Sequence, residues 1–265
     1  MRKLANLVLV LGMHRSGTSV LTRALPVFKI DIGQHYLARS DNPKGFFEDA
    51  TFVRLNELLL KNLGLSWQDP NAISTSTLLA LANGEMGQLA AKYLETLFAA
   101  QSWFGLKDPR ASRLLPFWLD VAKKLNINVK PILSLRHPFN VAASLAKRDG
   151  FSREKSSKLF VAYLKDCLQS LGELKVLVIS YDALLKDTEG QILRLANFFN
   201  LDVDAKQMTI FSQSFLEEGL RHHQNLTAGV DLDASTKEAL KIYTALLPKA
   251  YEPSAISFEQ LTMSD

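Results

Sequence analysis

The sequence is poor in the residues that build disulfide frameworks and metal sites. Its 265 residues include a single cysteine, Cys167, and five scattered histidines. One cysteine excludes a disulfide within the chain and favours a reducing compartment. No histidine has the spacing of a metal site, so we expect a protein that requires no metal.

Long apolar runs are also missing. No stretch approaches the ~20 residues that are needed to span a bilayer. The basic start Met1-Arg2-Lys3 before an apolar run imitates a secretory signal, but Asn6 interrupts the run and no small-residue cleavage site follows. We interpret the run as a buried strand and expect a cytoplasmic protein without a transmembrane segment.

The composition is otherwise that of an ordinary globular chain. Hydrophobic residues make up 47% of it, charged residues 22%, and the formal net charge is +4. Because the basic residues are spread along the chain, a small anionic ligand explains the excess as well as nucleic acid does, and we expect no nucleic-acid partner. The sequence has no repeat and no low-complexity linker, so residues 1–265 are expected to form a single domain.

Short apolar runs alternate with segments of helical periodicity. Runs typical of strands buried on both faces occupy residues 4–11, 103–106, 129–135 and 175–179. Apolar spacings of three and four predict helices at 18–27, 52–59, 78–98, 114–125, 138–147, 154–171 and 192–199. Ser235 and Glu238 have the pattern of a capping box at the start of a last helix. This alternation predicts an α/β fold with a mostly parallel central sheet flanked by helices.

The stretch GMHRSGTS, residues 12–19, joins the first predicted strand to the first predicted helix. A nucleotide-kinase loop reads Gly, four residues, then Gly-Lys-Ser/Thr. Gly12 and Gly17 keep this spacing, but Thr18 stands at the lysine position and the cation is Arg15. The loop therefore resembles a phosphate-binding loop that lacks the kinase lysine.

The same loop has the chemistry of an anion site. Backbone N–H groups at a helix N-terminus attract negative charge, and glycine lets the backbone approach a ligand closely. Arg15 adds a bidentate cation, and Ser16, Thr18 and Ser19 add hydroxyl donors. These residues predict a phosphate group at this turn.

A second anion site is predicted in ILSLRHPFNVAASL, residues 132–145. A buried strand ends at Arg136, Pro138 is suited to the first position of a helix, and Ser144 follows within its early turns. Arg136 and Ser144 could converge on one phosphate. Two separate anion sites fit a ligand with two separated anionic groups better than a single polyphosphate.

These two stretches resemble the donor-binding motifs of sulfotransferases that use 3′-phosphoadenosine 5′-phosphosulfate (PAPS). In that family a basic residue precedes Ser-Gly-Thr, as Arg15 does here, and an Arg-x-Pro strand end and a serine at the same spacing hold the 3′-phosphate. The resemblance implies a P-loop-NTPase-like three-layer fold and no required metal. It implies that the PAPS-binding residues include His14, through its backbone, and Arg15, Ser16, Gly17, Thr18, Ser19, Arg136 and Ser144.

The stretch DNPKGFFEDA, residues 41–50, contains a candidate general base. From physics alone, Glu48 is a first-turn carboxylate favoured by the helix dipole. The stretch also resembles an Asn-x-x-Gly-aromatic-aromatic-Glu motif of bacterial sulfotransferases, which implies that Glu48 deprotonates the acceptor hydroxyl. Asp49 is the alternative base.

The segment FGLKDPRASRLLPFW, residues 104–118, places Lys107 at the end of a predicted strand, where open α/β sheets bind ligands. Similar Lys-Asp-Pro-Arg segments in the family imply that Lys107 faces the sulfuryl group. Arg110 could help there or pair with Asp108.

Two later stretches are also similar to family segments. GLRHHQ, residues 219–224, resembles a basic segment that closes over the nucleotide, which implies a role for Arg221, although an exposed turn explains it as well. In SYDALLKD, residues 180–187, we expect Tyr181 to pack and Asp187 to cap the following helix.

Together these features predict transfer of a sulfuryl group from PAPS to an acceptor hydroxyl. Glu48 would be the base, and Arg15 and Lys107 would stabilise developing charge. The acceptor could be a saccharide, a lipid headgroup, a phenol or a peptide tyrosine, and analogy with bacterial relatives favours a carbohydrate or glycolipid. The alternatives are a P-loop kinase, with Asp108 as its magnesium carboxylate, and a catalytically silent nucleotide-binding protein.

Overall fold

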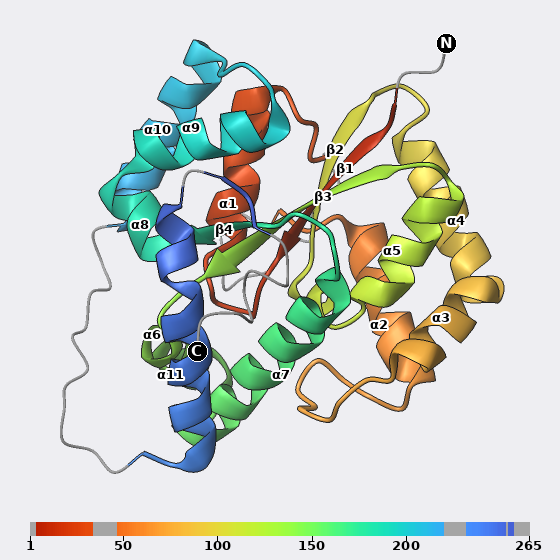
Figure 1. Ribbon diagram of the computed structural model, residues 1–265, viewed down its shortest axis with the longest axis vertical. Helices are drawn as coiled ribbons and strands as arrows, with labels where there is room; N and C mark the ends of the chain where they lie inside the picture. The colour runs from red at the N-terminus through yellow and green to blue at the C-terminus, as the bar shows by residue number, and fades with distance from the viewer. Residues whose placement is uncertain (1–3, 34–46, 220–231, 253, 257–265) are drawn as a thin grey trace.

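A computed structural model describes residues 4–33, 47–219, 232–252 and 254–256 of the chain (Figure 1). In these residues four parallel strands form one sheet in the order β2-β1-β3-β4. The strands are β1 (Asn6–Leu11), β2 (Trp103–Lys107), β3 (Asn128–Leu135) and β4 (Leu177–Ser180). Each lies where the sequence predicts a strand, and the predicted α/β fold with a parallel sheet is confirmed.

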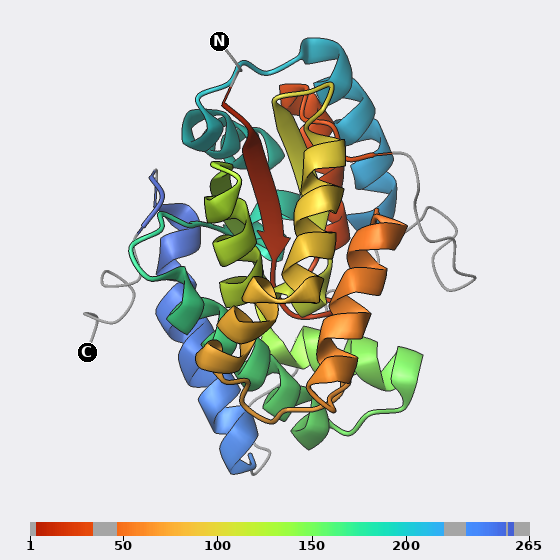
Figure 2. The ribbon, with the colours of Figure 1, turned by 90° about the vertical axis from the view of Figure 1, so that its right-hand side faces the viewer.

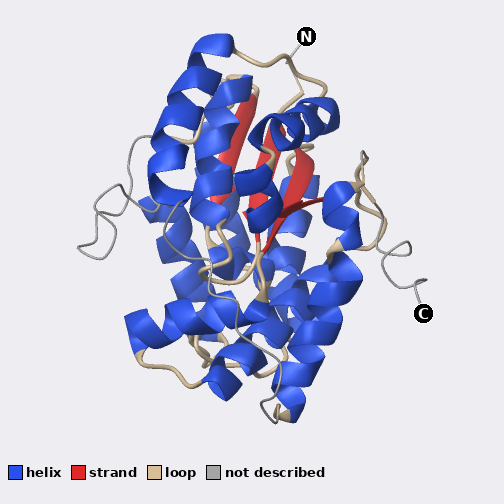
Figure 3. Ribbon diagram, turned by 90° about the vertical axis from the view of Figure 1, so that its left-hand side faces the viewer, coloured by secondary structure: helices blue, strands red, loops and turns tan. Residues whose placement is uncertain are grey.

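Helices cover both faces of the sheet, because side chains of a strand alternate between two cores. Leu7 and Leu9 of β1 belong to one core and Val8 and Val10 to the other. The first core, which faces the viewer in Figure 2, packs against α2 (Ala50–Asn62), α3 (Thr75–Asn83), α4 (Glu85–Leu97), α5 (Leu115–Lys124), α6 (Pro138–Asp149), α7 (Arg153–Leu171) and α11 (Ala234–Leu246). The second, on the side seen in Figure 3, packs against α1 (Thr18–Ala24), α8 (Tyr181–Lys186), α9 (Thr188–Phe199) and α10 (Ala205–Gly219).

Several predicted helices differ in the structure. The segment predicted as one helix at 78–98 is two, α3 and α4, because the backbone leaves helical geometry at Gly84 (φ −100°, ψ −161°). The first helix stops at Ala24, and Pro26 continues the chain in a 3₁₀ turn, η1 (Leu25–Phe28). Helices α8 and α10 were not predicted. No helix in the described ranges is long and apolar enough to cross a membrane.

The helix caps test two predictions. Asp187 caps α9 as predicted, since its carboxylate accepts a hydrogen bond from the Gly190 amide at 3.0 Å. The predicted capping box at Ser235 is wrong. Helix α11 begins two residues earlier, where the carboxylate of Asp233 accepts from the Thr236 amide at 2.9 Å.

Strand β4 is short, and the chain before it turns away from β3. It pairs with residues 132–135 only, while Val176 pairs with Ile256 in an antiparallel bridge. Pro131 of β3 lies in the half without a β4 partner, which suits a residue with no N–H to donate.

Arg194 of α9, whose side chain is buried, binds the segment that precedes Ile256. Its guanidinium donates hydrogen bonds at 2.7–3.2 Å to Gln191 Oε1 and to the carbonyl oxygens of Val178, Lys249, Ala250 and Glu252. Three of these carbonyls belong to the 3₁₀ turn η3 (Pro248–Tyr251) and the residue after it. Arg194 therefore ties the end of the described chain to β4 and α9.

Candidate functional site

The loop between β1 and α1 has a backbone that requires glycine at both ends. Gly12 has φ 136° and Gly17 has φ 90°, both in the left-handed half of φ space, and Arg15 between them has φ 68°. Gly17 is the N-cap of α1. The loop therefore lies at the positive end of the α1 dipole, as the sequence predicts for an anion site.

Two serines from neighbouring elements fix this loop. Ser112, in the 3₁₀ turn η2 (Pro109–Ser112), accepts a hydrogen bond from the Gly12 amide at 2.8 Å and donates to the Gly12 carbonyl at 3.2 Å. Ser134 of β3 donates to the Ser16 carbonyl at 2.8 Å. Neither serine was predicted to lie at the site. Ser134 carried a signal, since it is a polar residue inside a buried apolar strand, whereas Ser112 carried none.

The two predicted anion-binding stretches meet at Arg15. Its Nε donates to Ser144 Oγ of α6 at 2.8 Å, and Arg136 Nη1 donates to the Arg15 carbonyl at 3.0 Å. Arg136 directly follows β3, and its guanidinium carbon lies 4.6 Å from the ring centre of Tyr181. Its Nε is buried and has no hydrogen-bond partner in the described part of the chain. Two cations and a hydroxyl therefore converge at the carboxyl edge of the sheet.

The predicted base and the predicted strand-end lysine form a buried ion pair. Lys107 Nζ lies 2.6 Å from Glu48 Oε1 and 3.2 Å from Ser19 Oγ in the first turn of α1. Lys107, the last residue of β2, is only 2% exposed, and Glu48 is 9% exposed. The structure thus brings Glu48 and Lys107 to the helix that the anion-binding loop opens.

Asp49, the alternative base, has a structural role. One oxygen of its carboxylate accepts hydrogen bonds from the Phe52 amide at 2.9 Å and from the Tyr93 hydroxyl at 2.8 Å. Asp49 is therefore the N-cap of α2 and an anchor for α4. Glu48 is the carboxylate that faces Lys107.

Asp108 and Arg110 belong to a separate buried network. Asp108 accepts from Arg110 Nη1 and from Asn56 Nδ2, each at 2.9 Å, on different oxygens. Arg110 also pairs with Glu57 at 3.0 Å, and Trp118 Nε1 donates to Asn56 at 2.7 Å. Of the two roles open to Arg110, the structure shows the pair with Asp108. Each carboxylate oxygen of Asp108 already accepts a hydrogen bond from a protein side chain.

His14 is buried on the side of the loop away from α1. Its ring centre lies 4.5 Å from that of Trp67 and 5.6 Å from that of Tyr163. Burial, and after it the charges of nearby cations, lower the pKa of His14 well below its usual range; the cations are Arg110, Arg148, Lys107 and Arg15. A buried neutral ring fits a residue whose contribution to ligand binding is its backbone. The contact with Trp67 had no sequence signal.

Some predicted site residues lie outside the described ranges. These are Arg221, with the rest of residues 220–231, and residues 42–46 of the stretch that resembles the Asn-x-x-Gly-aromatic-aromatic-Glu motif. Within the loop, the side chains of Ser16 and Thr18 are buried, and Ser19 contacts Lys107. Among the described side chains, no group of three or more His, Cys, Asp and Glu could hold a metal ion.

The chain has the fold of sulfotransferase domains of known structure. The sulfotransferase domain from the olefin synthase of Synechococcus PCC 7002 matches with a TM-score of 0.56 over 92% of this chain and 96% of its own, at 16% identity. The sulfotransferase domain from the curacin biosynthetic pathway matches with a TM-score of 0.56 over 91% and 98%, at 13% identity. No protein-family model and no curated protein matches the sequence. These likenesses confirm the fold that the sequence resemblance predicted.

Proposed function

We propose that the protein is a sulfotransferase that moves a sulfuryl group from PAPS to an acceptor hydroxyl. One observation carries this proposal: Arg15, Arg136 and Ser144 converge at a glycine-bounded loop, and the Glu48–Lys107 pair lies against the helix which that loop opens. The shared fold with sulfotransferase domains supports it. We take residues 1–265 as one domain of this type.

The residues fit a donor with two separated anionic groups. Arg15 and the backbone N–H groups at the start of α1 would hold the 5′-phosphosulfate, and Arg136 and Ser144 would hold the 3′-phosphate. The buried, unpartnered Nε of Arg136 supports an anion at this position. PAPS, when bound, supplies an activated sulfuryl group. Arg221 is proposed to close over the nucleotide.

Glu48 would act as the general base. Its side chain, which lies 2.6 Å from Lys107 Nζ, would accept the proton of an acceptor hydroxyl as the oxygen–sulfur bond forms. Lys107 and Arg15 would then offset the charge that grows on the sulfonyl oxygens and on the departing 5′-phosphate oxygen. Preorganised donors of this kind are each worth roughly 3–4 kcal/mol of the activation barrier.

The kinase alternative fits the site less well. Thr18 stands where a kinase loop has its lysine. Asp108, the candidate magnesium carboxylate, has both oxygens bound by Arg110 and Asn56. A catalytically silent nucleotide-binding protein would have the same donor site and differs only in lacking transfer.

Transfer of labelled sulfate from PAPS to a panel of saccharides, glycolipids, phenols and tyrosine peptides tests the proposal. We expect labelling of one acceptor class, with a carbohydrate or glycolipid hydroxyl as the first candidate. Glu48→Gln should bind PAPS with unchanged affinity in calorimetry and lose transfer. Glu57→Gln, at the exposed carboxylate paired with Arg110, is the matched control and should retain transfer.

Three results would contradict the proposal or part of it. Binding of ATP with a divalent cation, without binding of PAPS, would point to a kinase. PAPS binding without transfer to any acceptor would point to the silent protein. Undiminished turnover in Glu48→Gln would remove Glu48 from its role.

A further inference from the structure

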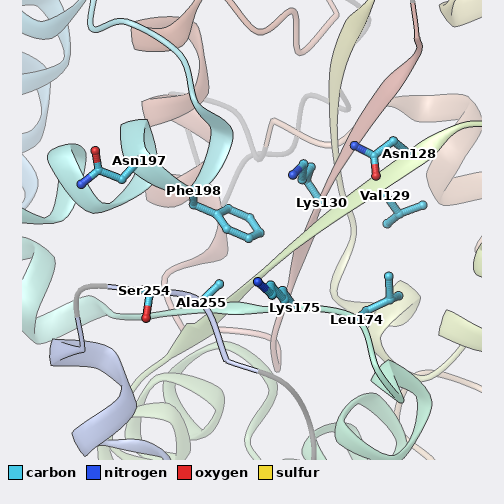
Figure 4. Close-up of a pocket in the computed structure, with 9 residues that line it drawn as sticks. All are labelled: Asn128, Val129, Lys130, Leu174, Lys175, Asn197, Phe198, Ser254 and Ala255. Atoms are coloured by element: carbon cyan, nitrogen blue, oxygen red, sulfur yellow. The ribbon is translucent and has the colours of Figure 1, made fainter.

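A cavity of about 420 Å³ opens at the amino end of the sheet (Figure 4). This volume lies within the range of small-molecule sites, roughly 300–1,000 Å³. It is lined by Asn128 and Lys130 of β3, by Lys175 before β4, and by Asn197 and Phe198 of α9. The anion-binding loop lies at the other end of β3. The eight residues of β3 span roughly 23 Å at ~3.3 Å per residue, so the two places are distinct.

The cavity exists because β4 begins beside Ile132 and leaves one edge of the first half of β3 without a neighbour among the described strands. Strand β4 pairs with residues 132–135 of β3, and Val176 pairs with Ile256 instead of with β3. Among the described residues, no strand therefore lies beside residues 128–131 of β3 on this edge. The last turn of α9 closes the opening from one side, and Figure 4 shows Phe198 reaching from it toward Lys130 and Lys175.

Lys130 is an unusual residue for its position. It is two residues before Ile132, whose side chain is fully buried in the core that packs against α9. Strands of a parallel sheet are covered on both faces and read as continuous apolar runs, so a lysine on this face needs an explanation. The ammonium of Lys130 lies over the Phe198 ring, 5.5 Å from its centre.

The charged side chains in the described lining of the cavity are both lysines. None of the residues that line it is acidic. Among the described residues, no carboxylate lies within ion-pair distance of Lys130 or Lys175. An anion in the cavity would meet two lysine side chains and no carboxylate of the described residues. Next to the lysines, Val129, Leu174 and the Phe198 ring supply apolar surface.

We propose that this cavity is a binding site for a small organic anion with a planar apolar body, of the class of aromatic carboxylates. Lys130 and Lys175 bind the carboxylate, and Asn197 offers a further hydrogen-bond group. Phe198 contacts the ring. The site does not depend on the proposed sulfotransfer, because it shares no residue with the loop or with the Glu48–Lys107 pair.

A titration of the ¹⁵N-labelled full chain with 1-naphthoate tests this assignment. We expect saturable amide shifts at Val129, Lys130, Lys175 and Phe198, and none in residues 12–19. In calorimetry, Lys130→Met and Lys175→Met should each weaken binding about tenfold, the loss expected for one charge-assisted contact. Lys123→Met, at an exposed lysine of α5, is the control and should leave the affinity unchanged.

The neutral 1-naphthamide separates charge from apolar contact, and we expect it to bind at least about tenfold more weakly than the acid. Equal affinities would overturn the assignment of an anion site. Shifts confined to residues 12–19 would assign the binding to the donor loop. The absence of saturable shifts up to about 10 mM naphthoate would also overturn the proposal. Because Lys175 is exposed, Lys175→Met keeps the test decisive if Lys130→Met does not fold.

Discussion

The ring of Tyr181 fills the space that a side chain at Gly17 would need. A β-carbon built on Gly17 would lie 2.5 Å from Cδ2 of Tyr181, well inside van der Waals contact. The same ring packs against the guanidinium of Arg136. Tyr181 therefore shapes both the N-terminus of α1 and the position of the arginine that is proposed to hold the 3′-phosphate.

The first prediction concerns Gly17. Gly17→Ala should lower the free energy of unfolding by about 2–5 kcal/mol, because left-handed backbone costs an L-residue about 1–2 kcal/mol and overpacking about 1–3 kcal/mol. Gly150→Ala is the matched control, since Gly150 also has a positive φ (69°) but nothing within 4 Å of its β-carbon position. Urea denaturation should show the smaller loss for Gly150→Ala. Equal losses would mean that the contact with Tyr181 has no effect.

The second prediction concerns donor binding. Arg136→Ala should raise the apparent KM for PAPS by about tenfold or more, the value of a charge-assisted hydrogen bond. Because Arg136 is proposed to anchor the donor away from the reacting atoms, kcat should change less than KM. Steady-state kinetics with Arg54→Ala, at an exposed position of α2, as the control measure this. A fall in kcat with KM unchanged would contradict the anchoring role.

The third prediction is a pH dependence of stability. The pKa of His14 is lowered in the folded chain, first by burial and then by its cationic neighbours. The unfolded chain binds a proton on this histidine near pH 6.5, so the unfolded state binds more protons than the folded state below that value. The free energy of unfolding should therefore fall by about 1.4 kcal/mol for each pH unit below about 6.5, until the folded pKa is reached.

Urea denaturation at about pH 7.5 and about pH 5.5 measures this. Between these values, wild type should lose about 1.4 kcal/mol more than His14→Leu, which has no proton to bind. Burial raises the pKa of Asp166, and this opposing contribution cancels in the difference between the two proteins. Identical losses would show that His14 is solvated in the folded protein.

The fourth prediction concerns the hydrogen bonds that Arg194 donates to four carbonyl oxygens. Arg194→Met would leave four carbonyl oxygens without their donor, and the free energy of unfolding should fall by about 3 kcal/mol. Arg54→Met, at an exposed arginine, should change it by no more than about 0.5 kcal/mol. Urea denaturation at neutral pH measures both. A loss no larger than that of the control would mean that water replaces the guanidinium at these carbonyls.

The sequence predicted the sheet because its strands are buried on both faces and therefore read as apolar runs. The ends of the helices were harder to predict than the strands. Gly84 splits one apolar pattern into two helices, and Asp233 rather than Ser235 caps α11, because both outcomes depend on backbone directions set by tertiary packing. Helix α8 has only six residues, too few to show a helical period.

Much of the candidate site could be predicted because loops at the carboxyl ends of parallel strands meet at one edge. Arg15, Arg136 and Lys107 all follow or end such strands, and the structure brings them there. Their partners could not be predicted. The bonds from Arg15 to Ser144 and from Ser112 to Gly12 join residues more than 90 positions apart and depend on how the elements pack.

The hydrogen bonds between Arg194 and residues 249–252 have a consequence for biosynthesis. During translation, Val176 and Arg194 leave the ribosome long before the segment that supplies their bridge and most of their carbonyl partners. Until residues 249–256 have been made, the backbone beside Val176 is open to strands of other nascent chains and Arg194 lacks three of its four carbonyl acceptors. Truncated translation products should therefore be the species that chaperones retain.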